Sequence, residues 1–329
     1  MYNQTKKWSS IHVFTFLITL VPVLLFFVII GNLVWNSIQA VQAVGLTSLL
    51  SDRISTIYSG VYDPQNPQYG LLPAMVGTLQ VSILTLIFAM PFSMSLALLA
   101  TEYNIRWIGR VIELLLSVFA GIPPIIYALL SVFVVKTFIQ PKFAAIELTE
   151  GLIRSLPGLP DYNPGVLPLE QSTLLGSIFL ALLIIPFVAP LIVDSIRNVP
   201  SEQKEASLAL GATRWYTLQR ITLPAAMPGI IMAASLGVLK ASGDVVISAW
   251  TIGLYHDFLP NPLWDVFERN ATLSSTGAGI VGGFYGGGAS VGTNFFVSNF
   301  AALLLVLFAF GVLAVSDLAR KWINRGYTL

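Results

Sequence analysis

The sequence predicts an all-α integral membrane protein with six transmembrane helices and a polar two-helix segment between the fourth and the fifth. Of the 329 residues, 55% are hydrophobic and only 10% are charged, whereas soluble domains carry about 25% charged residues. The mean hydropathy of the chain is +0.79. Six apolar stretches also reach the ~20 residues that a helix needs to cross the hydrocarbon core.

The six stretches are 11–35, 72–100, 111–139, 172–196, 224–254 and 295–315. Hydrocarbon offers no partner to backbone polar groups, so we expect helices rather than open strands. The first stretch follows Lys6 and Lys7, and it is longer than the apolar core of about 7–15 residues in a signal peptide. We therefore expect an uncleaved signal anchor, with cleavage near the small residues Ala40 and Ala43 as the alternative.

Composition narrows the chemistry of this single domain, residues 1–329. A net charge of +1 without a basic run gives no nucleic-acid signal. The absence of cysteine excludes disulfides, thiolate metal sites and cysteine nucleophiles. His12 and His256 lie far apart and have no metal-ligand spacing. We expect neither catalytic residues nor a metal site in this chain.

The distribution of Lys and Arg predicts the orientation, because cytoplasmic connections carry the excess of these residues. With a cytosolic N-terminus, the inside segments hold 11 of the 17 basic residues. These are Lys6, Lys7, Arg106, Arg110, Arg197, Lys204, Arg214, Arg220, Arg320, Lys321 and Arg325. Both termini and residues 200–224 are therefore expected in the cytosol.

The last outer connection contains a glycine-dense run at Gly277–Gly292. Its spacing of Gly279, Gly283 and Gly287 suits close helix packing if the run is helical at membrane depth. The alternative, which we favour here, is a flexible outer surface loop.

The polar segment Pro200–Pro224 is predicted to form two short helices that meet at Gly211. Ser201 is expected to cap the first helix, with Glu202 near its positive end. Gly211 is suited to a left-handed conformation that ends this helix. Thr213 then begins a second helix, and Pro224 marks the entry into the fifth span.

The residues Glu205-Ala206-Ser207, Gly211 and Ile221-x-Leu223-Pro224 carry a resemblance. Their spacing resembles the EAA loop of ATP-binding-cassette (ABC) importer permeases, EAA-x3-G-x9-I-x-LP, with Ser207 in place of the last alanine. The resemblance implies the type I importer permease fold and a segment that docks in a groove of a cytosolic ATPase. An ordinary amphipathic connection between spans is the alternative.

The chain lacks a phosphate-binding loop, since Gly-x-x-x-x-Gly-Lys-Ser/Thr occurs nowhere in it. The resemblance therefore implies that two partner ATPase subunits bind ATP and Mg²⁺, and that this chain binds no cofactor. It also implies a second homologous permease and an extracytoplasmic substrate-binding protein. The expected location is the lipid of a bacterial or archaeal cell (inner) membrane.

Charged residues within a span indicate function by default, because their desolvation is costly. Lys240 and Asp244 lie four apart in the predicted fifth span, so they are expected to pair on one helix face. A structural ion pair is the alternative to a substrate site. Glu113, near the start of the third span, is either interfacial or functional.

Two apolar stretches within residues 72–254 make the family resemblance more specific. Leu72-Pro-Ala-Met-Val-Gly-Thr-Leu and Ala120-Gly-Ile-Pro-Pro-Ile-Ile-Tyr-Ala-Leu are similar to stretches of phosphate-importer permeases. Those proteins carry R-A-x-G-E where this chain has Lys240-Ala-Ser-Gly-Asp244, and Pro124 and Ala128 replace their serine and glycine. The resemblance implies phosphate as the substrate.

The residues expected to line the substrate pathway are Gly121, Pro123, Pro124, Lys240 and Asp244. Pro123-Pro124 interrupts the predicted third helix, and the amino ends of broken helices can bind anions. A simple kink is the alternative. Lysine offers a point charge instead of the planar fork of arginine, so a lysine site selects the geometry of an oxyanion less strictly.

The sequence leaves three other functions open. The nearest is a permease of the same superfamily for molybdate, sulfate or an organic molecule. An ion-coupled secondary transporter is a second possibility. A membrane-bound enzyme is the third, although the sequence contains no apparent nucleophile–base–acid set.

Overall fold

The computed structural model describes residues 10–52, 68–102, 106–134, 171–254, 259, 263–266, 269–282 and 291–326. The helices, in chain order, are α1 (Ser10–Val44), α2 (Leu46–Leu49), α3 (Leu72–Thr101), α4 (Arg106–Ala120), α5 (Pro124–Val134), α8 (Thr173–Arg197), α9 (Ser201–Ala209), α10 (Arg214–Thr217), the π-helix η2 (Leu218–Thr222), α11 (Leu223–Ser242), the π-helix η3 (Ser248–Ile252), α12 (Leu273–Val281) and α13 (Val291–Gly326). The predicted all-α class is confirmed.

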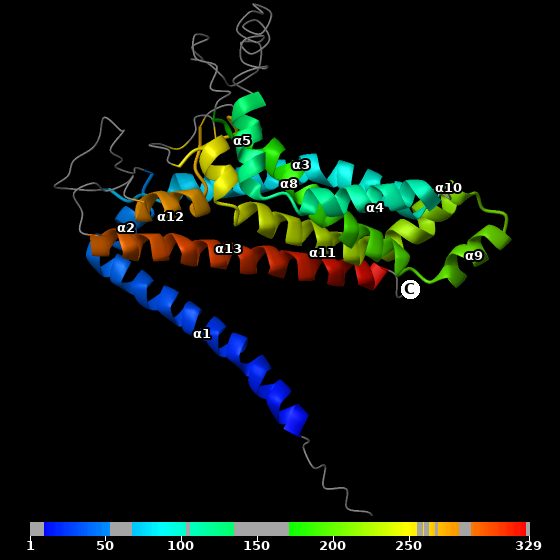
Figure 1. The fold of residues 1–329 in the computed structure, drawn as a ribbon, viewed down its shortest axis with the longest axis horizontal. Coiled ribbons are helices and arrows are strands. Elements are labelled where there is room, and N and C mark those ends of the chain that lie inside the picture. The colour runs from blue at the N-terminus through cyan, green and yellow to red at the C-terminus, as the bar shows by residue number, and fades with distance from the viewer. Residues whose placement is uncertain are drawn as a thin grey trace, which may run out of the picture.

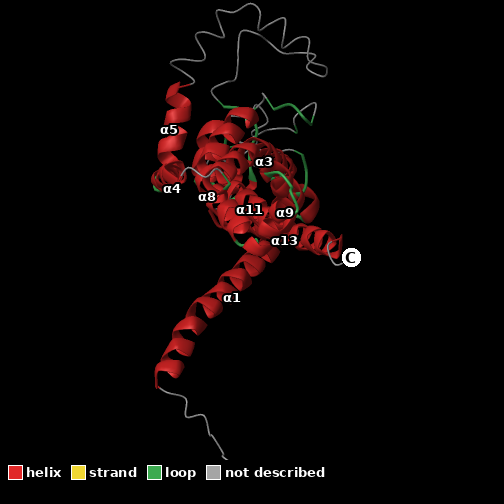
Figure 2. Cartoon of the chain, turned by 90° about the vertical axis from the view of Figure 1, so that its right-hand side faces the viewer, coloured by secondary structure: helices red, strands yellow, loops and turns green. Residues whose placement is uncertain are grey.

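Within the described ranges, five helices are long and apolar enough to cross a membrane, or six if α4 and α5 count as one bent span. The long helices α3, α8, α11 and α13 run alongside one another (Figure 1). Helix α1 leaves this bundle, as the end-on view in Figure 2 also shows. Its apolar 18-residue window has no buried residue, and only its C-terminal end packs against α13.

Helix α8 forms the centre of the bundle. Two thirds (67%) of its most apolar window is buried, a larger share than in any other described span. Its buried side chains, among them Ile184 and Ile192, pack with Ala89 of α3 and Ile230 of α11. Ser172 caps the helix by accepting a hydrogen bond from the Leu175 amide at 3.1 Å.

Small residues allow α11 to approach α8 closely. A Cβ atom on Gly229 would lie 2.3 Å from Ser195 Oγ, and one on Gly237 would lie 2.8 Å from Val188 Cγ2. Real Cβ atoms essentially never approach other atoms so closely. The spacing between these two helices therefore depends on the missing side chains, as expected where small residues line a membrane helix contact.

The described part of the predicted third span consists of two helices. Helix α4 ends at Ala120 and α5 begins at Pro124, and the two helices are bent by 90° at the break. The predicted interruption at Pro123-Pro124 is confirmed. Proline lacks a backbone N–H and forces the preceding residue out of the helical region, so a pair of prolines ends a helix.

The predicted fifth span is wrong at its C-terminal end. Helix α11 begins at Leu223, one residue before the predicted start, and it continues the run of α10 and η2 from Arg214. The helix ends at Ser242, with Gly243 as its C-cap residue, and does not continue to Leu254. The structure instead has a turn at Gly243 and Asp244 and then the short helix η3.

The favoured prediction of a surface loop at Gly277–Gly292 is wrong for the first part of the run. Residues 273–281 form α12, which packs against α13, and Gly279 is buried in it. Thr272 and Ser275 form a capping box at its start, which satisfies two backbone amides. Residues 283–290 lie outside the described residues.

Substitution of Gly77 tests the contact between α3 and the chain that leads into α12. A Cβ atom there would lie 2.0 Å from the Ala271 carbonyl oxygen. We expect Gly77→Ala to lower the free energy of unfolding by about 1–3 kcal/mol, because the backbone of α3 and the backbone at Ala271 must move apart to admit the methyl group.

Thermal unfolding of the detergent-purified chain measures this effect. Gly311→Ala is the matched control, since nothing lies within 4 Å of its added methyl group. Equal midpoints for the two variants would contradict the close approach at Gly77.

Candidate functional site

The 200–224 segment joins the end of α8 to α11, and its first part is the polar helix α9. None of its nine residues is buried. Pro200 occupies the N-cap position and makes no side-chain cap bond. The predicted cap at Ser201 is therefore wrong: Ser201 is the first residue inside the helix. The predicted position of Glu202 in the first turn is confirmed.

Gly211 ends this helix in the left-handed conformation, as predicted, with φ +87°. Its amide donates to the Leu208 carbonyl at 3.0 Å, and the Ala212 amide donates to the Ser207 carbonyl at 3.2 Å. These bonds satisfy carbonyls at the helix end. No atom lies within 4 Å of a Cβ at Gly211, so the glycine is required by its backbone angle and not by space.

The second predicted helix begins where expected. Thr213 is its N-cap residue and accepts a hydrogen bond from the Tyr216 amide at 3.2 Å. From Arg214 the backbone runs through η2 into α11 without interruption. The wide π turn lies just before Pro224, which has no N–H to offer the Arg220 carbonyl in the α-helical pattern.

The motif residues of this segment divide into exposed and covered groups. Glu205, Ala206 and Gly211 are exposed, whereas Ser207, Ile221, Leu223 and Pro224 are partly covered. Large apolar side chains are exposed as well: Leu210 is 90% exposed and Trp215 is 63% exposed. A polar segment that displays such side chains is typical of a surface that meets another protein.

Two polar contacts hold α9 to the rest of the chain. Lys204 Nζ lies 2.9 Å from Glu102 Oε1 at the end of α3. The Ser207 and Thr217 hydroxyl oxygens lie 2.9 Å apart. No local sequence pattern indicates the first contact, because 102 residues separate its partners.

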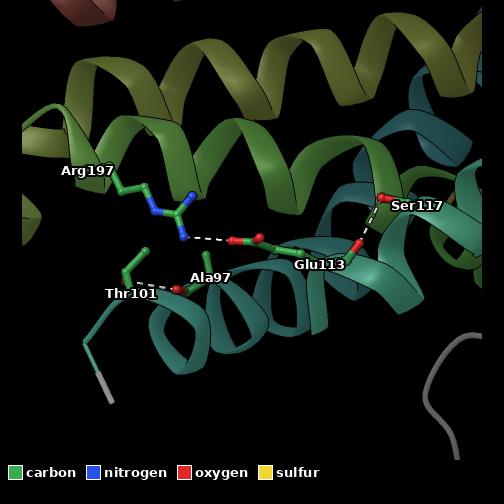
Figure 3. Close-up of polar contacts among 5 residues, drawn as sticks. All are labelled: Ala97, Thr101, Glu113, Ser117 and Arg197. Atoms are coloured by element: carbon green, nitrogen blue, oxygen red, sulfur yellow. Dashed lines mark hydrogen bonds and ion pairs between the residues drawn. The ribbon is translucent and has the colours of Figure 1, made fainter. Parts of the chain in front are cut away.

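A second ion pair joins the end of α8 to α4. Arg197 Nη2 lies 2.6 Å from Glu113 Oε1, and the two side chains are 52% and 46% exposed (Figure 3). The Ser117 hydroxyl donates to the Glu113 carbonyl at 2.8 Å. Of the two roles considered for Glu113, the exposed ion pair favours the interfacial one.

The predicted pairing of Lys240 with Asp244 on one helix face is wrong. The helix ends at Ser242, so Asp244 lies in the following turn, where Oδ1 accepts a hydrogen bond from the Ile247 amide at 2.7 Å. No ion pair within 4.0 Å joins these two described residues. Lys240 is exposed, and its Nζ lies 5.0 Å from the centre of the Phe187 ring.

The break between α4 and α5 leaves Gly121 and Pro123 exposed and Pro124 partly covered. The Tyr127 hydroxyl donates to the Phe119 carbonyl at 3.1 Å, so a side chain of α5 satisfies a backbone group at the end of α4. Ile122 and Val246 pack against the same buried cluster, which includes Tyr127 and Ile247. The structure thus brings the break close to the turn that follows Lys240.

A buried polar contact that the sequence analysis missed joins α3 to the start of α12. The Leu273 amide donates to Thr78 Oγ1 at 2.9 Å, and the Ser274 hydroxyl donates to the Asp244 carbonyl at 3.1 Å. Thr78 and Leu273 are 195 residues apart, so no local pattern could have linked them. In the described part of the chain, no three His, Cys, Asp or Glu side chains form a group that could hold a metal ion.

Comparisons with known proteins agree with this architecture. Residues 89–329 match the family described as binding-protein-dependent transport system inner membrane component. The phosphate transport system permease protein PstC of Haemophilus influenzae is 29% identical over 274 residues, which cover 83% of this chain and 82% of that protein. PstC 1 of Mycobacterium bovis is 29% identical over 273 residues, covering 82% and 77%.

A solved structure of a bacterial alginate ABC transporter, in complex with an alginate-bound periplasmic protein, has the same fold. Its TM-score is 0.58 at 17% identity, and the match covers 96% of this chain and 98% of that one. The family match spans more than half of the chain. The chain therefore belongs to the binding-protein-dependent transport system inner membrane component family and is a multi-pass permease subunit of an ABC importer.

Proposed function

We propose that this permease imports inorganic phosphate. The observation that carries the proposal is the similarity to permease proteins named for phosphate transport over about four fifths of this chain. The resemblance of residues 72–79 and 120–129 to stretches of phosphate-importer permeases agrees with this similarity.

In the proposed topology, α4 and α5 together form one broken span, which makes six spans in total. An even number of spans places the C-terminus on the same side of the membrane as the N-terminus. The excess of Lys and Arg assigns that side to the cytosol. The 200–224 segment then faces the cytosol. The outer end of α3 and the start of α12 face the other side.

The segment around Gly211 is proposed as the docking site for the ATPase. Leu210 and Trp215 expose apolar surface on it, and burial against a partner recovers about 25 cal/mol for each Å². Two ATPase subunits would bind ATP and Mg²⁺, and a second permease subunit would complete the pathway. An external binding protein would deliver the substrate.

Closure of the ATPases would move the 200–224 segment and switch the pathway from inward-open to outward-open. The continuous run from Arg214 to Ser242 supports this route, since 29 helical residues extend about 43 Å as a stiff rod. Movement at Arg214 would therefore reach Lys240 near the other end of the same rod. The released phosphate would pass beside the exposed Lys240 ammonium.

The fold alone does not select the solute, because the alginate transporter shares it. A permease of this family for another solute is therefore the second candidate. Equilibrium binding of phosphate, sulfate and molybdate to the partner binding protein would separate the two candidates. Selective phosphate binding is the expected result.

Gly211→Pro tests the coupling role of the segment. Proline fixes φ near −65°, whereas residue 211 has φ +87°, so the turn between α9 and α10 cannot form. We expect loss of phosphate uptake and of substrate-stimulated ATP hydrolysis in proteoliposomes that contain the complete transporter.

Gly211→Asn is the control, because asparagine enters the left-handed region at modest cost. It should retain both activities. Normal uptake and normal ATPase stimulation by Gly211→Pro would overturn the coupling role.

Separate substitutions distinguish the roles of Lys240 and Asp244. Lys240→Ala should reduce phosphate uptake about tenfold, which corresponds to ~1.4 kcal/mol of lost charge stabilisation, and Lys240→Arg should restore it. Asp244→Asn should leave uptake close to normal, because the amide oxygen can still accept from the Ile247 amide. Asp244→Ala should instead destabilise the chain by about 1 kcal/mol, as the loss of a helix cap does.

Uptake of radioactive phosphate, normalised to the amount of inserted protein, measures the first effect, and thermal unfolding measures the second. Unchanged uptake by Lys240→Ala would remove Lys240 from the pathway. A large loss of uptake by a stable Asp244→Asn protein would show that the charge at this position is required.

A further inference from the structure

Helix α9 is attached to the bundle through a face that is entirely polar. Its partly covered residues are Lys204 and Ser207, and its other seven residues are exposed. A spacing of three places both side chains on one face of the helix. Since no residue of α9 is buried, directional polar contacts hold the helix in position, and no buried apolar core does.

The two contacts lead to different spans. Ser207 bonds to Thr217, which belongs to the rod that continues into α11. Lys204 bonds to Glu102, the C-cap residue of α3, whose amide donates to the Leu98 carbonyl at 3.0 Å. A displacement of α9 therefore acts on the fifth span through the backbone and on α3 through one ion pair.

The electrostatics of the α3 terminus favour this ion pair. A helix C-terminus carries a partial negative charge, so a carboxylate there is unfavourable unless a cation lies beside it. Lys204 supplies that cation. Both side chains are only about one quarter exposed, at 25% and 26%, whereas the Arg197–Glu113 pair is about half exposed. Water therefore screens the Lys204–Glu102 pair less than the other pair.

Helix α3 reaches the far side of the bundle from this contact. It packs along α8 and α11, and near its other end Thr78 Oγ1 accepts a hydrogen bond from the Leu273 amide. At the adjacent Gly77, the Ala271 carbonyl lies too close to admit a Cβ atom. Movement of α3 would thus reach the start of α12, where Ser274 bonds to the Asp244 carbonyl.

We propose that the Lys204–Glu102 ion pair is a second coupling arm, which moves α3 together with α9 while the α10–α11 rod moves the fifth span. Both residues are positioning residues, and neither contacts the substrate. The inference rests on the proposed function, in which the ATPase drives the 200–224 segment. Without the ion pair, ATP hydrolysis continues but moves only one of the two spans.

The test compares Lys204→Gln, Glu102→Gln, Lys204→Arg and the exchanged double variant Lys204→Glu/Glu102→Lys. Each is assembled with its ATPase, partner permease and binding protein in proteoliposomes, and the ratio of inorganic phosphate imported to ATP hydrolysed is measured. We expect this ratio to fall about threefold in both Gln variants, the effect of losing a partly covered ion pair. The Arg variant and the exchanged variant should restore it.

The matched control is Arg197→Gln, which breaks an ion pair of similar length that does not involve α9. Its ratio should remain normal. Co-purification with the ATPase and the unfolding temperature show that each Gln variant folds and assembles. A merely structural role would lower the amount of assembled transporter without changing the ratio, and that result would overturn the proposal.

The same experiment separates this proposal from the coupling role of the segment. If Gly211→Pro abolishes uptake but both Gln variants keep a normal ratio, the segment couples and the ion pair does not. If the exchanged double variant fails to restore a lowered ratio, charge pairing is not the cause and the proposal is wrong. If Gly211→Pro itself is without effect, the proposed function fails first.

Discussion

The close packing of α8 with α3 and α11 is the constraint on which the other described elements depend. In hydrocarbon, helices gain little from excluding water, so association relies on van der Waals contact between surfaces that fit closely. Gly229 and Gly237 allow that fit against Ser195 and Val188. This packing brings the polar ends of these helices together, and the 200–224 segment connects α8 to α11.

This arrangement separates rigid parts from a lightly held one. Helix α8 is mostly buried, and its side chains pack among those of the neighbouring helices. Helix α9, in contrast, has no buried residue and is held by the polar contacts of Lys204 and Ser207. Polar contacts of this kind contribute about 1 kcal/mol each. A part that receives motion from another subunit needs such weak but directional attachments, because a buried core would resist displacement.

The serine that departs from the EAA pattern has a physical role in this attachment. In the sequence, Ser207 is a small residue in the place of an alanine. In the structure its hydroxyl bonds to Thr217 across Gly211, and it therefore ties the two short helices together. The departure is consistent with the family fold and adds a contact that alanine cannot make.

Much of this protein was predictable from local chemistry alone. Long apolar stretches are expected to be helical in hydrocarbon, the adjacent prolines 123 and 124 were expected to interrupt their helix, and Gly211 was expected in the left-handed conformation that it adopts. The EAA spacing also led to the family that the comparisons support. Each of these conclusions depends on residues close together in the chain, where composition and backbone geometry decide the outcome.

Tertiary structure alone decided which helices meet and how the chain turns after Ser242. Apolar residues resume at Val245, so the predicted span continued to Leu254 even though Gly243 is of the residue type that commonly ends helices. The turn there is stabilised by the Asp244 bond to Ile247 and by contact with Ser274 of α12. In the same way, Lys204 forms an ion pair with Glu102 only because the packing of α3 against α8 brings the end of α3 beside α9. Such contacts join residues from distant parts of the chain, and a pattern within one segment cannot encode which distant partner the folded bundle supplies.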